Sequence, residues 1–490
     1  MKIFTIGDSI SQGFMSMSAA RTDLSYSTII ARLMGIPDDD YKFPNWPLGG
    51  HPANLENILR GLNIRFGTNL MGFEWFGVLA TIARGLDQVE DYYERGDGRA
   101  DNPYDSNAVK FFHNAAIRGY SIADVFDVDS EFCLKKIDEA KKRFLNDGIM
   151  ATPSASFART ALRVLNPSLQ DKYMKFTILD WLKHHHHTEG VENLILWLGA
   201  NNALGTILTL RIKQTNNDPN RRPFQIPYDE REEFNLWHPE DFRADYTELL
   251  VRTDAIMADT KGKAPDWKVF LATIPLITIA PLAKGVGETT TVTRKSDGKT
   301  CIYYKYYTYV PFTLEHAQKH PIKLNLPQAV HIDECIIEYN KIIKSLASDL
   351  NTKHGQERYC VVDIAKNLDE MAFKRNDSNI KYAFPEYFKF VYPMPNTKFY
   401  HATPNGDMEQ GGIFSLDGVH PSAIGQGLIA WEFLKVMDKA RGTNLASAMN
   451  WEEIFKSDTL YQKPISLMQE IYQHDGLKEL MLDILDATRD

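Results

Sequence analysis

The chain has 490 residues, of which 43% are hydrophobic and 24% are charged, an ordinary globular composition with ample apolar surface for a large core. Its formal net charge is -9 and it has no long run of Lys or Arg, which disfavours a nucleic-acid partner or an anionic membrane surface. The four cysteines lie far apart, without the spacing of a disulfide framework or a metal site, so reduced thiols are expected.

The N-terminus shows no recognisable signal peptide, because Met1 and Lys2 run directly into a strand-like segment without an apolar h-region. A secreted or periplasmic protein whose leader has been removed would look the same. The longest apolar run, 269–283, is too short to span a bilayer and contains Pro275 and Pro281. We therefore expect a cytoplasmic protein with no transmembrane segment.

Strands and helices alternate along the chain. Runs rich in β-branched and aromatic residues predict five buried strands, at 2–6, 109–113, 193–198, 268–274 and 359–364. Helical patterns between or after them lie at 26–35, 121–126, 241–260 and 333–351. This alternation predicts an α/β protein built on a parallel sheet.

Four connections are longer than a simple crossover requires, and we interpret them as insertions: 36–108, 127–190, 206–240 and 282–330. The last contains a predicted hairpin at 289–312, with its turn at Ser296-Asp297-Gly298. From Leu445 onward the pattern is helical and interrupted by polar residues. A helical C-terminal extension over 441–490 is therefore expected.

Polar motifs directly follow three of the predicted strands. Gly7-Asp8-Ser9 follows the first, 114–121 (NAAIRGYS) follows the second, and 199–202 (GANN) follows the third. Because ligands bind outside the carboxyl ends of the strands in open parallel sheets, these motifs are expected to share one crevice. Taken alone, Gly7-Asp8-Ser9 is equally typical of a turn or a helix cap.

A fourth motif, Asp417-Gly418-Val419-His420-Pro421, precedes a helical run near the end of the chain. Its spacing lets the carboxylate of Asp417 reach the Nδ1–H group of His420 and fix the tautomer of the imidazole. An imidazole oriented in this way beside a serine hydroxyl is what nucleophilic acyl transfer requires. In isolation, the same residues are typical of a turn with a capped surface histidine.

Taken together, these motifs resemble the four conserved blocks of the SGNH hydrolases, also called GDSL esterases and lipases. They occur in the order of that family: Gly7-Asp8-Ser9-Ile10, Gly119 within 114–121, Gly199-Ala200-Asn201-Asn202, and Asp417 to Pro421. Two positions depart from the family pattern. Ile10 stands where Leu is common, and Asn202 stands where the family usually has Asp.

The resemblance implies a three-layer α/β/α, flavodoxin-like fold with a five-stranded parallel sheet, and the activity of a serine esterase. It implies Ser9 as the nucleophile, His420 as the general base and Asp417 as the residue that orients His420. It further implies an oxyanion hole formed by the N–H groups of Ser9 and Gly119 and the side-chain amide of Asn201. No metal or organic cofactor is expected. Since Ser9 and His420 must meet, a single α/β domain over 1–440 is predicted.

Other functions remain open. A small-molecule or lipid-like ester is the preferred substrate, with an O-acetylated carbohydrate as the alternative. An acyltransferase would use the same groups as a hydrolase, with an alcohol in place of water. A non-catalytic binding protein that has kept the fold is a further alternative, supported only by the departure at Asn202.

Three further signals concern binding. The four histidines at 184–187 suggest a metal site, although a solvated loop before the third strand is the preferred interpretation. The apolar segment 70–86 is interpreted either as a lid or acyl-binding surface or as a helix packed on the core. Aromatic and apolar residues of two insertions are expected to line an acyl pocket, with platforms on which sugars stack as the alternative: Met71, Phe73, Trp75, Phe76, Tyr303, Tyr304, Tyr306, Tyr307 and Tyr309.

Overall fold

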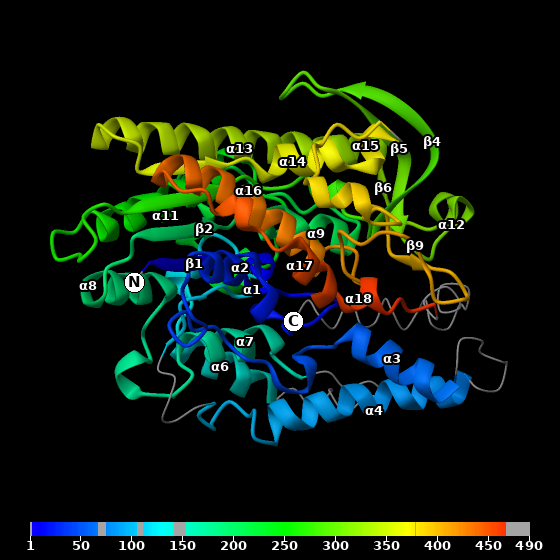
Figure 1. Cartoon of the computed structure of the whole chain (residues 1–490), viewed down its shortest axis with the longest axis horizontal. Coiled ribbons are helices and arrows are strands. Elements are labelled where there is room, and N and C mark those ends of the chain that lie inside the picture. The colour runs from blue at the N-terminus through cyan, green and yellow to red at the C-terminus, as the bar shows by residue number, and fades with distance from the viewer. Residues whose placement is uncertain (1, 67–74, 105–110, 142–152, 378, 467–490) are drawn as a thin grey trace.

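The centre of the molecule is a sheet of four parallel strands, in the order β1 (Ile3–Gly7), β2 (Asn193–Trp197), β3 (Lys268–Ala272) and β7 (Tyr359–Val362) (Figure 1). The structure, a computed structural model, describes residues 2–66, 75–104, 111–141, 153–377 and 379–466. β1 and β2 are buried along their whole length. A strand that is covered on both faces consists of a continuous run of apolar residues. The sequence therefore predicted these four strands correctly.

The prediction of a strand at 109–113 is not confirmed. Residues 109–110 lie outside the described residues, and 111–113 do not form a strand. Instead, Thr5 and Asn114 form an isolated parallel bridge on the free edge of β1. Its hydrogen bonds run from Thr5 N–H to the His113 carbonyl and from Ala115 N–H to the Thr5 carbonyl, each 2.9 Å. The pairing is too short for a fifth strand.

Helices connect and cover the strands. In chain order they are α1 (Ser9–Gln12), α2 (Tyr26–Leu33), α3 (Leu55–Phe66), α4 (Trp75–Glu94), α5 (Asp124–Asp127), α6 (Ser130–Lys141), α7 (Ser156–Leu165), α8 (Ile178–Thr188), α9 (Asn201–Thr209), α10 (Tyr228–Arg231), α11 (Pro239–Met257), α12 (Leu314–Lys319), α13 (Leu326–His354), α14 (Ile364–Met371), α15 (Phe373–Asn376), α16 (Ala423–Arg441), α17 (Trp451–Ser457) and α18 (Thr459–Gln462). The predicted helices at 26–35, 121–126, 241–260 and 333–351 correspond to α2, α5, α11 and α13.

The helix α13 is longer than the pattern predicted, because capping residues extend it at both ends. Asn325 accepts the N–H group of Gln328, and the side chain of Gln328 accepts the N–H group of Asn325. At the other end, Gly355 adopts φ +64°, a left-handed conformation in which helices commonly end.

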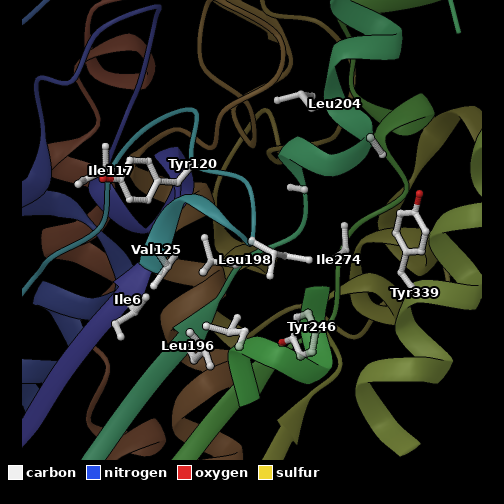
Figure 2. Packing of buried hydrophobic residues seen from close by; sticks show 14 of the residues in the cluster. Ile6, Ile117, Tyr120, Val125, Leu196, Leu198, Leu204, Tyr246, Ile274 and Tyr339 are labelled. Atoms are coloured by element: carbon white, nitrogen blue, oxygen red, sulfur yellow. The ribbon is translucent and has the colours of Figure 1, made fainter. Parts of the chain in front are cut away.

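Both faces of the sheet are buried against helices. On one face, Leu196 of β2 lies in the same core cluster as Leu249 of α11 and Ile336 of α13. Figure 2 shows part of this cluster, including Leu196 of β2 and Tyr246 of α11. On the other face, Trp197 packs against Phe433 of α16, with ring centroids 6.0 Å apart. Successive side chains of β2 therefore point to opposite faces of the sheet, and each packs against a different layer of helices.

The insertions carry smaller sheets and helices of their own. The predicted hairpin is confirmed as β4 (Ala283–Thr293) and β5 (Thr300–Tyr309), with Thr293 opposite Thr300 and the turn between them. A short strand, β6 (Leu324–Asn325), pairs with β5. A further two-stranded sheet consists of β8 (His401–Ala402) and β9 (Met408–Gln410).

The C-terminal region is helical as far as the structure describes it. Ile454 of α17 packs into the core cluster beneath α16, and Leu460 of α18 packs into a cluster with residues of α3 and α4. Residues 467–490 lie outside the described residues. The division into a domain over 1–440 and an extension over 441–490 stays a prediction.

The four cysteines are buried, and none forms a disulfide. Within the described ranges, no helix combines the length and the apolar character needed to cross a bilayer.

A buried ionic cluster fastens the β4–β5 hairpin to the main body. Arg375 of α15 donates to Asp333 of α13 at 2.9 Å, and both side chains are completely buried. Asp333 also accepts the hydroxyl of Tyr303 on β5 at 2.7 Å and the hydroxyl of Thr278 at 2.6 Å. One carboxylate thus links a hairpin, a long helix and the loop that follows β3.

We predict that Asp333→Ala lowers the free energy of unfolding by about 3–5 kcal/mol, because it leaves the Arg375 guanidinium buried without its anion. Denaturant unfolding of the full chain measures this change. The control is Glu315→Ala, which breaks the Glu315–Lys319 pair, whose two side chains are both largely exposed, and should change stability little. Equal effects of the two substitutions would contradict the prediction.

Candidate active site

Ser9 lies at the carboxyl end of β1, where the strand turns sharply into α1. The carboxylate of Asp8 accepts the N–H group of Ile10 at 3.1 Å and so caps the short helix. Gly7 permits the turn, because a Cβ atom there would lie 2.2 Å from Ser11 Oγ and 3.0 Å from the Trp197 carbonyl. The hydroxyl of Ser9 is thereby fixed at the edge of the sheet.

The structure brings Ser9, Asp417 and His420 into one hydrogen-bonded chain. His420 Nε2 lies 2.9 Å from Ser9 Oγ, and His420 Nδ1 lies 3.0 Å from Asp417 Oδ2. A carboxylate can only accept, so Nδ1 carries the proton and Nε2 of the neutral ring accepts the Ser9 hydroxyl. In this arrangement, His420 can remove the hydroxyl proton as Ser9 attacks an electrophile.

Backbone N–H groups hold the Asp417 carboxylate in place. Met17 donates to Oδ2 at 2.9 Å, while Val419 and His420 donate to Oδ1 at 2.9 and 2.8 Å. Burial raises the pKa of Asp417, but the charge of His420 and these hydrogen bonds outweigh it, so the pKa lies below its ordinary value. The carboxylate is therefore ionised and oriented toward the imidazole.

The Met17 N–H group reaches Asp417 through an unusual backbone conformation. Ser16 and Met17 have φ values of +50° and +64°, a left-handed region that residues other than glycine rarely occupy. Ser16 N–H donates to Ser415 Oγ at 2.9 Å, next to the Asp417 contact. Strain of this kind persists only where surrounding contacts enforce it, and here it aims two donors at the turn that carries His420.

The second and third predicted motifs lie at the same end of the sheet, beside the carboxyl ends of β1 and β2. Asn201 begins α9 after β2, and its side-chain amide donates to the Tyr120 carbonyl at 2.8 Å. On the other side of this turn, Ile117 N–H donates to the Gly7 carbonyl at 3.0 Å. Gly119 lies between these two anchors with φ +80°, a conformation that glycine adopts without strain.

The neighbouring Asn202 points elsewhere. It is fully buried, and its side-chain oxygen accepts the N–H group of Ile122 at 3.3 Å. Asn201, in contrast, lines the same cavity as Ser9 and His420. Of the two adjacent amides, Asn201 is the one that faces the site.

The site occupies the point where the chain order of the sheet reverses. After β1, the chain first returns to pair with one edge of β1, at Asn114. It then crosses over, and β2 pairs with the opposite edge of β1. In open α/β sheets, the crevice outside the carboxyl ends at such a reversal is where ligands bind. Ser9 follows β1 and Asn201 follows β2, so both flank this crevice.

An apolar cavity extends from Ser9 and His420 into the protein. Apart from Asp8, Asn201, Asn367 and Glu432, the side chains that line it beyond Ser9 and His420 are apolar. Most of them come from α9, α14, α16 and the loops that follow β3 and precede α16, including Leu204, Leu276, Ile277, Ile364, Leu368, Met371, Ile413, Phe414, Val419, Leu428 and Ile429, while Ile10 and Trp197 come from α1 and β2. An apolar group attached to an electrophile at Ser9 would be buried there.

The prediction that insertion aromatics line this pocket is wrong for the tyrosines of β5. None of the five lines the cavity, and Tyr303 and Tyr307 are fully buried in the core around Arg375. Met71 and Phe73 lie outside the described residues, as do the side chains of Trp75 and Phe76. Further along the segment 70–86, Ile82 and Leu86 pack with α3, as expected for a helix packed on the core.

The four histidines at 184–187 belong to the helix α8, so the preferred interpretation of a solvated loop is wrong. His185 and His186 are buried. One ligand atom each of His113, His185 and Glu189 lies within 4.8 Å of the others, a spacing that suits a metal ion.

The hydrogen bonds of this cluster argue against a metal. Lys42 N–H donates to His113 Nδ1 at 2.8 Å, so in the neutral ring Nε2 carries the proton and has no lone pair for an ion. Burial lowers the pKa of His113 to about 4 and that of His185 to about 3, so both rings are neutral. His185 Nδ1 lies 3.1 Å from Glu189, so this ring nitrogen is already engaged by a carboxylate.

Several contacts of the site had no recognisable signal in the sequence. Phe14 packs against the His420 ring with centroids 4.6 Å apart, and Met17 supplies a donor to Asp417 only through its backbone. The cavity walls come from segments that looked like ordinary core helices. The positive φ angles of Ser16 and Met17 likewise could not be predicted from the composition or the periodicity of the sequence.

In comparisons with protein-family models, with curated proteins and with solved structures, the chain showed no significant match. The case for a function therefore depends on the geometry of the site.

The carboxyl group of Asp8 is expected to make the stability of the protein depend on pH. Burial raises its pKa to about 6, although the Ile10 N–H group and the charge of His420 act in the opposite direction. The folded state thus holds this proton more tightly than the unfolded chain, whose carboxyl ionises near pH 4. The contribution of Asp8 to stability should therefore fall as the pH rises from about 4 to about 6 and stay lower above that interval.

Asn at this position keeps the helix cap but cannot ionise. We expect Asp8→Asn to match the wild type at pH 4 and to be more stable at pH 8, by on the order of 2–3 kcal/mol. Denaturant unfolding of both proteins across this pH range measures the difference. Parallel stability profiles at every pH would show that Asp8 does not titrate in this way.

Proposed function

We propose that the protein is an ester hydrolase of the SGNH type that forms an acyl-enzyme on Ser9. The observation that carries the proposal is the chain of hydrogen bonds from Asp417 through His420 to Ser9, at the mouth of an apolar cavity. A serine hydroxyl, an oriented imidazole and an ionised carboxylate are together sufficient for nucleophilic acyl transfer.

In the proposed reaction, Ser9 Oγ attacks the carbonyl carbon of the ester while His420 Nε2 takes the hydroxyl proton. The tetrahedral intermediate collapses, and His420 returns the proton to the departing alcohol. Water, deprotonated by the same imidazole, then attacks the acyl-enzyme and releases the acid. Asp417 keeps the imidazole in the required tautomer and stabilises its protonated form throughout.

The developing oxyanion is assigned to three donors: the N–H groups of Ser9 and Gly119 and the side-chain amide of Asn201. The position of Asn201 on the cavity wall supports its part in this assignment. One amide N–H of Asn201 is used by the Tyr120 carbonyl, which leaves the second for the oxyanion. Donors fixed in this way need no reorganisation when charge develops.

We further infer the flavodoxin-like, three-layer fold that the SGNH resemblance implies. When the pairing of Thr5 with Asn114 is counted as an edge strand, the strand order becomes 2-1-3-4-5 in chain order, as in flavodoxin-like sheets. Helical layers on both faces of the sheet support the same inference.

The cavity favours an apolar acyl group over the alternatives. An O-acetylated carbohydrate would leave most of the aliphatic walls without a partner, because an acetyl group is short. An acyltransferase remains compatible with the same residues, since only the nucleophile of the second step differs. A non-catalytic binding protein would not need a hydrogen bond between His420 and Ser9.

A series of p-nitrophenyl esters from acetate to decanoate tests the proposal. We predict that kcat/KM rises into medium chain lengths, by up to about fourfold for each methylene that the cavity buries. Ser9→Ala should abolish turnover of every ester without a loss of stability. Activity confined to the acetate would favour the carbohydrate deacetylase, and full activity in Ser9→Ala would refute the proposed nucleophile.

The two adjacent asparagines provide a matched test of the oxyanion donor. Asn201→Ala should lower kcat by about 100- to 1000-fold, the usual cost of removing one such donor. Asn202→Ala removes a buried amide whose oxygen accepts the N–H group of Ile122, so its main effect should be a lower free energy of unfolding. Its loss of kcat should be smaller than that of Asn201→Ala. A larger loss of kcat in folded Asn202→Ala than in Asn201→Ala would contradict the assignment.

A further inference from the structure

The segment 379–398 covers the outer side of the apolar cavity. Tyr382 and Phe388 pack in one cluster with four residues that line the cavity: Met371, Ile413, Phe414 and Leu428. Tyr382 also donates its hydroxyl to Glu432, another lining residue, at 2.5 Å. The inner face of the segment is therefore part of the wall that encloses the proposed acyl site.

The outer face of the same segment exposes large apolar side chains. The exposed fraction is 79% for Phe390, 96% for Tyr392 and 40% for Met394. Among the described residues, half of the exposed large hydrophobic side chains lie between 380 and 394. Single exposed apolar residues are common, but three at alternate positions of one short segment mark an interaction surface.

The segment is also locally basic on an acidic protein. Between 379 and 398 the sequence has three lysines, Lys381, Lys389 and Lys398, and one acidic residue, Glu386, whereas the whole chain has a net charge of -9. Glu386 pairs with Lys389 at 3.0 Å. The average charge of the chain argued against an anionic membrane surface, but the segment 379–398 carries a net charge of the opposite sign.

We propose that this face docks on a lipid–water interface that contains anionic lipids, with Phe390, Tyr392 and Met394 inserted at the boundary of head groups and acyl chains. Aromatic side chains with a polar tip are favoured at that depth, and long lysine side chains reach back to the head groups. Apolar area and positive charge both add to the affinity of such a surface. The proposal goes beyond ester hydrolysis, because docking requires no turnover.

Docking of this kind would turn toward the lipid the side of the protein on which Tyr382 and Phe388 enclose the cavity. It would also hold the enzyme at the surface where lipid-like esters are concentrated. The arrangement gives the exposed triplet, defined as Phe390, Tyr392 and Met394, a role in delivering substrate rather than in the chemical step.

Vesicle co-sedimentation of the full chain tests the proposal. The vesicles contain phosphatidylcholine with phosphatidylglycerol, and parallel samples contain phosphatidylcholine alone. We predict binding that is stronger to the anionic vesicles, and a partition coefficient that falls by roughly tenfold or more in the double variant Phe390→Ser, Tyr392→Ser. Ser9→Ala should bind as the wild type does, so failure of the esterase proposal and failure of docking can be told apart.

The control is the double variant Ile64→Ser, Val251→Ser, which removes two hydrophobic side chains, 87% and 56% exposed, from α3 and α11. It should bind vesicles as the wild type does. Hydrolysis of a monomeric short ester should be unchanged by Phe390→Ser, Tyr392→Ser, while hydrolysis of an ester presented in vesicles should fall. Absence of vesicle binding in the wild type, or equal losses in the two double variants, would overturn the proposal.

Discussion

The hydrogen bond between His420 Nε2 and Ser9 Oγ joins residues that are 411 positions apart in the chain. Its length depends on two turns: the one at Gly7 that ends β1, and the one from Ser415 to His420. The second turn is fixed from several directions, by the N–H groups of Ser16 and Met17 and by the N–H group of Leu282, which donates to the Gly418 carbonyl at 3.0 Å. Segments that follow α1 and β3 thus help to position the imidazole of His420.

Four strands and the hairpin could be predicted from the sequence, because their signals are local. A strand buried on both faces is a short apolar run, and the hairpin turn carries its own residues at Ser296 to Gly298. The convergence of Ser9, Asn201 and His420 was partly predictable as well. Parallel strands bring their carboxyl ends to one edge, so a motif after each strand is placed by topology before any side chain is considered.

The rest depends on tertiary contacts without a local signature. The tyrosines of β5 looked like pocket aromatics, but the carboxylate of Asp333 accepts the hydroxyl of Tyr303 in the core. His185 looked like a metal ligand or a loop residue, whereas burial among aromatic rings keeps it neutral within α8. Residues 111–113 have strand-like composition but pair with β1 only around Asn114. In each case, the partner that decides the outcome lies far away in the sequence.

Labelling with a fluorophosphonate, followed by mass spectrometry of the digested protein, tests the central claim most directly. The probe reacts only with a serine whose hydroxyl is activated by a neighbouring base. We predict one adduct, on Ser9, that is lost in Ser9→Ala and much reduced in folded His420→Ala. An adduct on a different serine, or no adduct on the folded wild-type protein, would contradict it.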